Sequence, residues 1–208
     1  MILDHKNKKA LELAIHYLKN DNLFIYPTDT LYGFGGNARS DQVLDLLYDI
    51  KNRPVNMPVS LLARDVEMIR EYAVISKKTE KLASEFLPGA LTMVLPSKNN
   101  TLPKRLFNVE GFLGFRIPNH EFCNHMSAEF DNPIITTSVN KSGSPALNDI
   151  KSIHDQFGDK IKLYISDRDL EQKGSTTGST VVMIDRNDHI KILREGVISR
   201  SQIINILR

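Results

Sequence analysis

The hydrophobic pattern of this chain alternates between two periods. Apolar residues three and four positions apart predict helices at 11–18, 41–51, 64–72, 77–86 and 121–130, another ending near 157, and a closing helix after Ser199. Short apolar runs predict strands at 23–26, 58–63, 91–95, 112–117, 133–137, 162–165, 180–184 and 190–193. Strands that alternate with helices predict an α/β fold. The final hairpin adds antiparallel pairing, so we expect a mixed sheet.

The stretch 26–37 (YPTDTLYGFGGN) is the centre of the predicted fold. Pro27 cannot donate to a sheet ladder, so the strand before it should end there. The glycines that follow predict a turn, and Ser40 or Asp41 can cap the next helix. A strand, a glycine turn and a helix N-terminus together suit an anion, because free N–H groups point toward it.

Composition narrows the class of protein. The 208 residues fit one domain, 1–208, and 27 Lys+Arg against 25 Asp+Glu give no strong attraction for bulk nucleic acid or membranes. The single cysteine, Cys123, favours a reducing compartment, and with no signal peptide or apolar run of about 18 residues we expect a cytoplasmic protein. His120, Cys123 and His125 do not have zinc-site spacing.

Candidate site residues follow the predicted strands and the second helix. Open α/β sheets bind ligands at strand ends. We expect four cations to converge in one hollow and suit a polyphosphate, although each alone is typical of a solvated surface charge: Lys51, Arg53, Arg116 and Arg194. Ser138 and Asn140 would add neutral donors and acceptors. There is no P-loop and no nucleophile elbow, so the residues alone indicate only an α/β domain with a basic, hydroxyl-rich anion site.

Seven short motifs occur in an order that resembles a known family. They are YPTDTLYGFG at 26–35, KNRP at 51–54, LPGALT at 87–92, FRIP at 115–118, TSVN at 137–140 followed by Ser142 and Gly143, GSTV at 178–181 and ILR at 192–194. Together they resemble the YrdC-type threonylcarbamoyl-adenylate synthases over about residues 10–205. The resemblance implies the short, single-domain form, with a twisted mixed sheet flanked by helices and a large basic concave cavity.

The resemblance also implies an activity. It is the nucleotidyl transfer that condenses L-threonine, bicarbonate and ATP to threonylcarbamoyl-AMP and pyrophosphate, with Mg²⁺ expected on the ATP and no tightly bound cofactor. A separate transferase complex would then modify adenosine 37 of tRNA, and a direct contact with tRNA is left open. No metal ligand from a protein side chain is implied.

The family motifs assign roles to particular residues. Those implied to hold threonine are Thr30, Arg116, Thr136 and Ser179. Those implied to hold ATP are Lys51, Arg53, Ser138, Asn140 and Arg194, with Lys51 and Arg53 also implied in catalysis.

The chain departs from the family pattern at three positions. Met57 stands where many members have Asn, Leu62 where many have His, and Ala146 where a Ser is common. Two other functions therefore stay open beside the synthase. One is an RNA-binding module of the same fold, which the near-neutral charge and 7% aromatic residues disfavour. The other is a paralogue that forms a different carbamoyl-adenylate.

Overall fold

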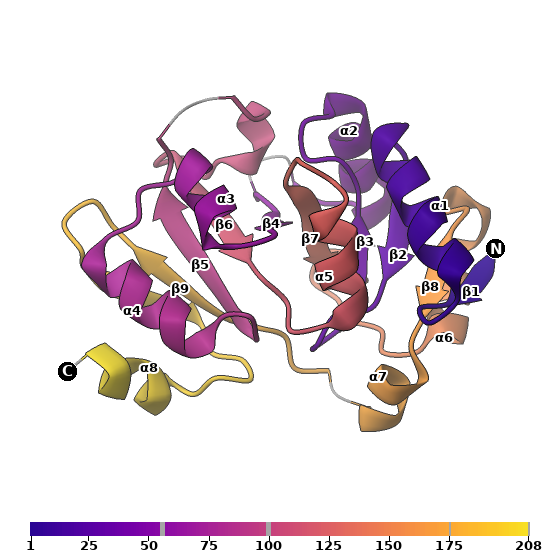
Figure 1. Ribbon diagram of the computed structural model, residues 1–208. Helices are drawn as coiled ribbons and strands as arrows, with labels where there is room; N and C mark the ends of the chain where they lie inside the picture. Colours follow the sequence, from indigo (N-terminus) through magenta and orange to yellow (C-terminus); the bar gives the residue numbers. More distant parts are fainter. Residues whose placement is uncertain (55–56, 99–100, 175, 208) are drawn as a thin grey trace.

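The computed structural model describes residues 1–54, 57–98, 101–174 and 176–207. Its described strands form one ten-stranded sheet in the order β1-β8-β2-β3-β7-β4-β6-β5-β9-β10, and the two ends of the chain lie on opposite sides (Figure 1). The strands are β1 (Ile2–Asp4), β2 (Phe24–Tyr26), β3 (Gly33–Gly35), β4 (Ser60–Leu62), β5 (Leu91–Pro96), β6 (Phe112–Arg116), β7 (Ile134–Ser138), β8 (Tyr164–Ser166), β9 (Thr180–Ile184) and β10 (Ile190–Arg194). The helices are α1 (Lys8–Lys19), α2 (Asp41–Lys51), α3 (Val66–Tyr72), α4 (Lys77–Phe86), α5 (Glu121–Ala128), α6 (Ile150–Phe157), α7 (Arg168–Lys173) and α8 (Arg200–Leu207).

The sheet is mixed, as the sequence predicts. β4 pairs with β6 in parallel and β5 with β9 in parallel, whereas β9 and β10 form the predicted antiparallel hairpin. β7 joins the two halves of the sheet. Its carboxyl end pairs with β3, where Gly33 lies opposite Ser138, and its remainder pairs with β4, where Ser60 lies opposite Thr136. This arrangement brings the turn after β2 beside the loop after β7, although they are more than a hundred residues apart in sequence.

The predicted cap of α2 is present, and a capping box precedes α8. The Ser40 side chain accepts from the backbone N–H of Val43 at 3.3 Å, which fixes the start of α2. The capping box before α8 is also formed, because Ser199 N–H donates to Gln202 Oε1 at 2.9 Å and Gln202 N–H donates to Ser199 Oγ at 3.3 Å. The left-handed conformation of Asn52 ends α2 and turns the chain toward Arg53.

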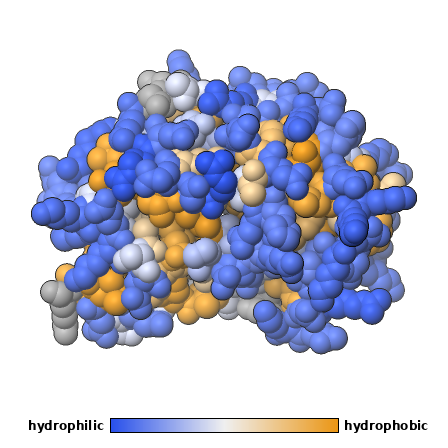
Figure 2. Space-filling view, in the orientation of Figure 1, coloured by the Kyte–Doolittle hydropathy of each residue, from blue (hydrophilic) through white to orange (hydrophobic). Residues whose placement is uncertain are grey.

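The core is divided into two clusters of buried side chains. The smaller one packs α1 and α5 against Phe24, Tyr26 and Leu62, and the larger one joins the other helices to the rest of the sheet. Polar residues cover most of the face seen in Figure 2, and apolar residues show in a band between α4 and α5. Within the described residues, no helix has the length and apolar character needed to cross a membrane.

Three elements were not predicted: β1, β3 and α7. β1 has only three residues, and α7 has six, so neither produces a readable period. β3 contains two glycines, which weaken a strand by themselves. Packing requires glycine at position 35, because a Cβ there would lie 2.7 Å from the Phe24 ring of β2. The predicted glycine turn is therefore partly wrong, because Gly33 and Gly35 lie in strand β3.

The predicted anion position at the N-terminus of α2 is also unsupported, since that end of the helix lines neither cavity described below.

Candidate functional site

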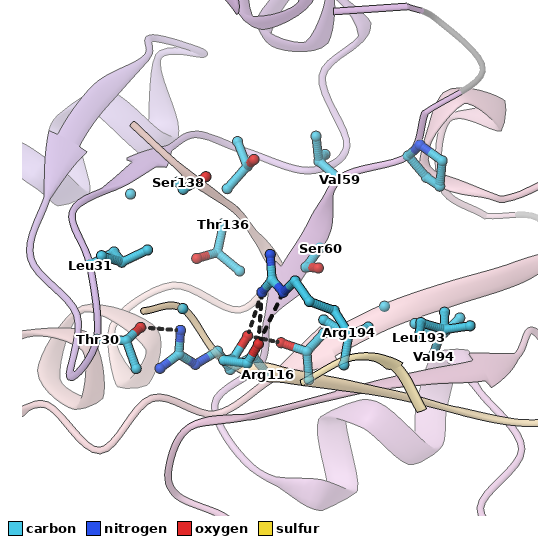
Figure 3. Close-up of a pocket in the computed structure, with 18 of the residues that line it drawn as sticks. Thr30, Leu31, Val59, Ser60, Val94, Arg116, Thr136, Ser138, Leu193 and Arg194 are labelled. Atoms are coloured by element: carbon cyan, nitrogen blue, oxygen red, sulfur yellow. Dashed lines mark hydrogen bonds between the residues drawn. The ribbon is translucent and has the colours of Figure 1, made fainter. Parts of the chain in front are cut away.

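A cavity of about 410 Å³ opens between the two halves of the sheet. The turn after β2, the carboxyl ends of β6 and β7, and the hairpin of β9 and β10 all contribute to its wall. Figure 3 shows Thr30 and Arg116 at one side, Val94 and Leu193 at the other, and the side chain of Arg194 between them. Seven of the nine residues assigned by the family motifs line this cavity: Thr30, Arg53, Arg116, Thr136, Ser138, Ser179 and Arg194.

Arg116 is held in place by three acceptors. Its guanidinium donates to Asp29 Oδ1 at 2.5 Å, to Thr30 Oγ1 at 2.8 Å and to the carbonyl of Gly89 at 3.3 Å. Only 6% of Arg116 is exposed, so these bonds fix its rotamer in a region of reduced screening. The part of the side chain that faces the cavity is therefore a preoriented donor for a small anion such as a carboxylate.

Ser179 is fixed by a second set of hydrogen bonds at the start of β9. Its hydroxyl lies 2.8 Å from the hydroxyl of Thr92 on β5, and its carbonyl accepts from Arg194 Nη2 at 2.7 Å. Burial is the main cause that lowers the pKa of Arg194, and the charge of Arg116 adds to it. Guanidinium groups stay protonated in proteins, so the two arginines place positive charge on adjoining parts of the cavity.

Arg53 reaches the cavity from the end of α2. Its Nε donates to the carbonyl of Met57 at 2.8 Å and its Nη2 to the carbonyl of Pro58 at 2.9 Å. These bonds hold the guanidinium beside the wall formed by residues 58–60. Three arginines from distant parts of the chain therefore share one cavity, as the sequence predicts.

Lys51 does not join them, and this part of the prediction is wrong. Lys51 is 1% exposed and lines neither described cavity. Its Nζ donates to the carbonyls of Ser138 and Asn140 at 2.5 and 2.9 Å and to Asn140 Oδ1 at 3.1 Å, and it lies over the Phe34 ring. Burial, with a smaller effect of the Arg53 charge, lowers the pKa of Lys51 to about 7. Lys51 thus anchors the loop that presents Ser138 and Asn140.

A second cavity of about 320 Å³ adjoins the first and shares Leu31, Ser138, Gly178 and Arg194 with it. Asn140 and Ser144 line one side, and Thr176 and Thr177 line another. Ser138 Oγ donates to Asn140 Oδ1 at 2.7 Å, which fixes the amide orientation. The two cavities together offer hydroxyl, amide and guanidinium groups along one continuous path.

One wall of the large cavity is apolar. It is formed by side chains of neighbouring strands: Val94, Phe112, Val181 and Leu193. Such a wall suits a flat apolar group, with the polar side reserved for anions. Sequence reasoning missed this wall, and it did not pair Asp29 with Arg116 or Thr92 with Ser179. Asp29 had a local signal as a charged residue inside the 26–37 stretch, whereas strand partners depend on pairing that the sequence does not reveal.

The three departures from the family pattern have different positions. Leu62 is 1% exposed and packs in the smaller core cluster, away from the cavities. Met57 is 46% exposed, and only its carbonyl takes part in the site, as the acceptor for Arg53. Ala146 lines the second cavity, so it alone of the three replaces a polar group on a cavity wall.

Among the described residues, one cluster has donors that could hold a metal ion: His5, His120 and Asp167. His120 Nδ1 accepts from the N–H of Phe122 at 3.2 Å, so its proton lies on Nε2 and points at Asp167 Oδ2, 2.9 Å away. A metal at Nε2 would require the other tautomer and would set two N–H groups against each other. The cluster is therefore better explained as a cap for α5 and α7. Cys123 and His125 are not part of it.

The chain matches a family model over residues 16–196. The model is that of the Sua5, YciO and YrdC proteins and carries the description "Telomere recombination". A relative from Methanocaldococcus jannaschii, named as a putative threonylcarbamoyl-AMP synthase, is 32% identical over 94% of this chain and 89% of its own. The threonylcarbamoyl-AMP synthase of Pseudoalteromonas translucida is 30% identical over 84% of this chain and 93% of its own.

Solved structures share the fold. Pyrococcus abyssi Sua5, crystallised with L-threonine, superposes with a TM-score of 0.88 at 25% identity, over all of this chain and 61% of that one. Escherichia coli YciO superposes with a TM-score of 0.86 over 98% of this chain and 97% of that one, and its 21% identity supports the fold alone. The twisted mixed sheet flanked by helices agrees with both. The family match over most of the sequence and the 32% identical relative lead to one conclusion: this chain belongs to the Sua5/YciO/YrdC family.

Proposed function

We propose that this protein is a threonylcarbamoyl-AMP synthase. It condenses L-threonine, bicarbonate and ATP and releases pyrophosphate, which makes it a nucleotidyltransferase. The observation that supports this most strongly is the shared cavity, in which Arg53, Arg116 and Arg194 line one space of about 410 Å³. Curated relatives named for the same activity support it independently. Neither an RNA-binding role nor a different carbamoyl-adenylate is favoured by them.

The threonine end of the cavity is the part around Arg116. Its guanidinium would bind the carboxylate of the amino acid, and Thr30 and Ser179 would orient the rest of the molecule. Thr136, which is 8% exposed on β7, would complete this pocket. A preoriented arginine loses little side-chain entropy on binding, so it favours one pose of a small substrate.

The nucleotide end extends from the large cavity into the second one. Arg53 and Arg194 would bind phosphate oxygens, and Ser138 and Asn140 would add neutral hydrogen bonds. The apolar wall with Phe112 would hold the base of the nucleotide. Lys51 contributes indirectly in this account, because it fixes the loop that carries Ser138 and Asn140.

The reaction depends on bringing anions together. Threonine carbamate must attack the α-phosphate, and both reactants are negatively charged. Arginines on adjoining walls offset this repulsion, and holding the two groups in one cavity replaces an encounter in solution. The described lining of the large cavity has no carboxylate that could serve as a strong general base. Positioning and positive charge therefore supply most of the acceleration.

Mg²⁺ is expected to arrive with ATP. Oxygen ligands suit this ion, and it is commonly held by substrate phosphates and water with few protein groups. Among the described residues that line the two cavities, Glu195 is the one carboxylate, at the second cavity. Glu195 Oε1 accepts from the N–H of Arg200 at 2.8 Å, and the carboxylate would face a hydrated ion in the second cavity. When bound, Mg²⁺ would reduce the charge of the phosphates.

The product would serve tRNA modification in a cytoplasmic setting. A separate transferase would take the threonylcarbamoyl group from the adenylate and place it on adenosine 37. That partner, and any direct contact with tRNA, belong to this proposal together with the location.

Pyrophosphate release tests the proposal. The purified protein is incubated with ATP, Mg²⁺, L-threonine and bicarbonate, and each component is omitted in turn. We expect release only when threonine and bicarbonate are both present, and a product that carries ¹³C from labelled bicarbonate. Release that ignores threonine, or that proceeds equally with bicarbonate removed, would contradict it.

A further inference from the structure

Tyr32 connects the cavity wall to a helix outside it. Tyr32 lines the large cavity, and its carbonyl accepts from the N–H of Val139 at 3.0 Å, just after β7. Its buried hydroxyl accepts from the N–H of Asp167 at 2.8 Å and donates to Glu171 Oε1 at 2.8 Å. Burial raises the pKa of the Tyr32 phenol, so the hydroxyl keeps the proton that it donates.

Glu171 in turn contacts two more segments. The same Oε1 atom accepts from the N–H of Ile150 at 3.3 Å, at the start of α6. The carbonyl of Glu171 accepts from the N–H of Gly174 at 3.0 Å, where the left-handed Gly174 ends α7. Glu171 therefore lies where two loops are anchored. One runs from β7 to α6 (139–149), and the other follows α7 toward Ser179.

These two loops line the second cavity. Ser144 and Ala146 come from the first loop, and Thr176 and Thr177 come from the second. We propose that Glu171 is a positioning residue for the nucleotide end of the site. Through its bonds to Tyr32 and Ile150, it sets the distance between the loops that receive the phosphates. This inference rests on the proposed function.

The effect should fall mainly on one substrate, because Ser179 at the end of the second loop is held separately by Thr92 on β5, at 2.8 Å. Arg116 at the threonine end is held by Asp29, Thr30 and Gly89, and none of these residues belongs to α6, α7 or the two loops. Loss of the Glu171 carboxylate would leave the Tyr32 hydroxyl with only the longer bond to the Asp167 carbonyl, at 3.3 Å, and would release the start of α6. The nucleotide end would change while the threonine end stays ordered.

Glu171→Ala and Glu171→Gln test the proposal, with Gln172→Ala as the matched control on an exposed position of the same helix. For Glu171→Ala we expect the KM for ATP to rise by about fivefold or more, as for a lost hydrogen bond to a charged group, while the KM for threonine stays within about twofold. The Gln variant should recover most of the ATP affinity, because its amide oxygen can still accept from Tyr32. Gln172→Ala should match the wild type.

Hydrogen exchange of the substrate-free protein gives a second measurement. Faster exchange in the two loops of Glu171→Ala, with unchanged exchange in β6, is the expected result. An equal rise in both KM values would overturn the proposal, and so would unchanged ATP affinity and loop exchange. If the wild type releases no pyrophosphate, the proposed function fails, and the exchange measurement still decides whether Glu171 orders the loops.

Discussion

Arg116 enters the cavity already paired with a carboxylate. Its bond to Asp29 Oδ1 at 2.5 Å offsets part of the free-energy cost of burying a guanidinium. The bonds to Thr30 and Gly89 orient the rest of the guanidinium toward the cavity. Lys51 differs from Arg116. Its ammonium donates to three oxygens of the loop 138–140, so its charge holds this loop and does not face the cavity. Two cations from similar motifs thus have different physical roles.

The buried Lys51 predicts a pH dependence of stability. Its pKa is about 7 in the folded protein and about 10.4 in an unfolded chain. Between these values the unfolded state binds more protons, so the free energy of unfolding should rise with pH through this group, by up to about 1.4 kcal/mol per pH unit. Urea unfolding of the wild type and Lys51→Met from pH 7.5 to 9.5 measures it.

The wild type should show the steeper rise with pH, since the variant has no group that titrates at this position. Equal slopes for the two proteins would mean that the three oxygens hold the lysine pKa near its ordinary value.

Among the secondary-structure elements, β3 holds together two strands next to the cavity, β2 and β7. It pairs with both β2 and β7, and it consists of Gly33, Phe34 and Gly35. The two glycines meet different neighbours. A Cβ on Gly35 would lie 2.7–2.9 Å from the rings of Phe24 and Tyr26, whereas a Cβ on Gly33 would come no closer than 3.5 Å to any atom. The close approach of the strands therefore depends on one glycine more than on the other.

Gly35→Ala should destabilise the protein by about 1–3 kcal/mol, because two buried rings must shift to admit the methyl group. Gly33→Ala is the matched control, with the same chemical change in the same strand and ordinary contacts. We expect it to cost less than about 1 kcal/mol. Thermal unfolding of both variants measures the difference, and an equal loss of stability would refute the steric explanation.

At the scale of the whole molecule, periodic segments were predictable and short ones were not. α4 was predicted with the bounds it has, 77–86, because its apolar stripe and its Ser76 cap are both local features. β3 was missed because its glycines make sense only against the rings of β2. The site follows the same division. Arg53, Arg116 and Arg194 were placed by motifs at strand and helix ends, but Lys51 points elsewhere because of its partners in the loop 138–140. The apolar wall with Phe112 depends on strand order, which no local pattern encodes.

In the proposed synthase, one cavity holds an amino acid and a nucleotide side by side. A crystal structure with L-threonine and a non-hydrolysable ATP analogue would show both ligands in place. We expect the threonine carboxylate on Arg116, and phosphates on Arg53 and Arg194 that extend toward Ser138 and Asn140. Density for either ligand outside the two cavities, with these arginines unoccupied, would contradict it.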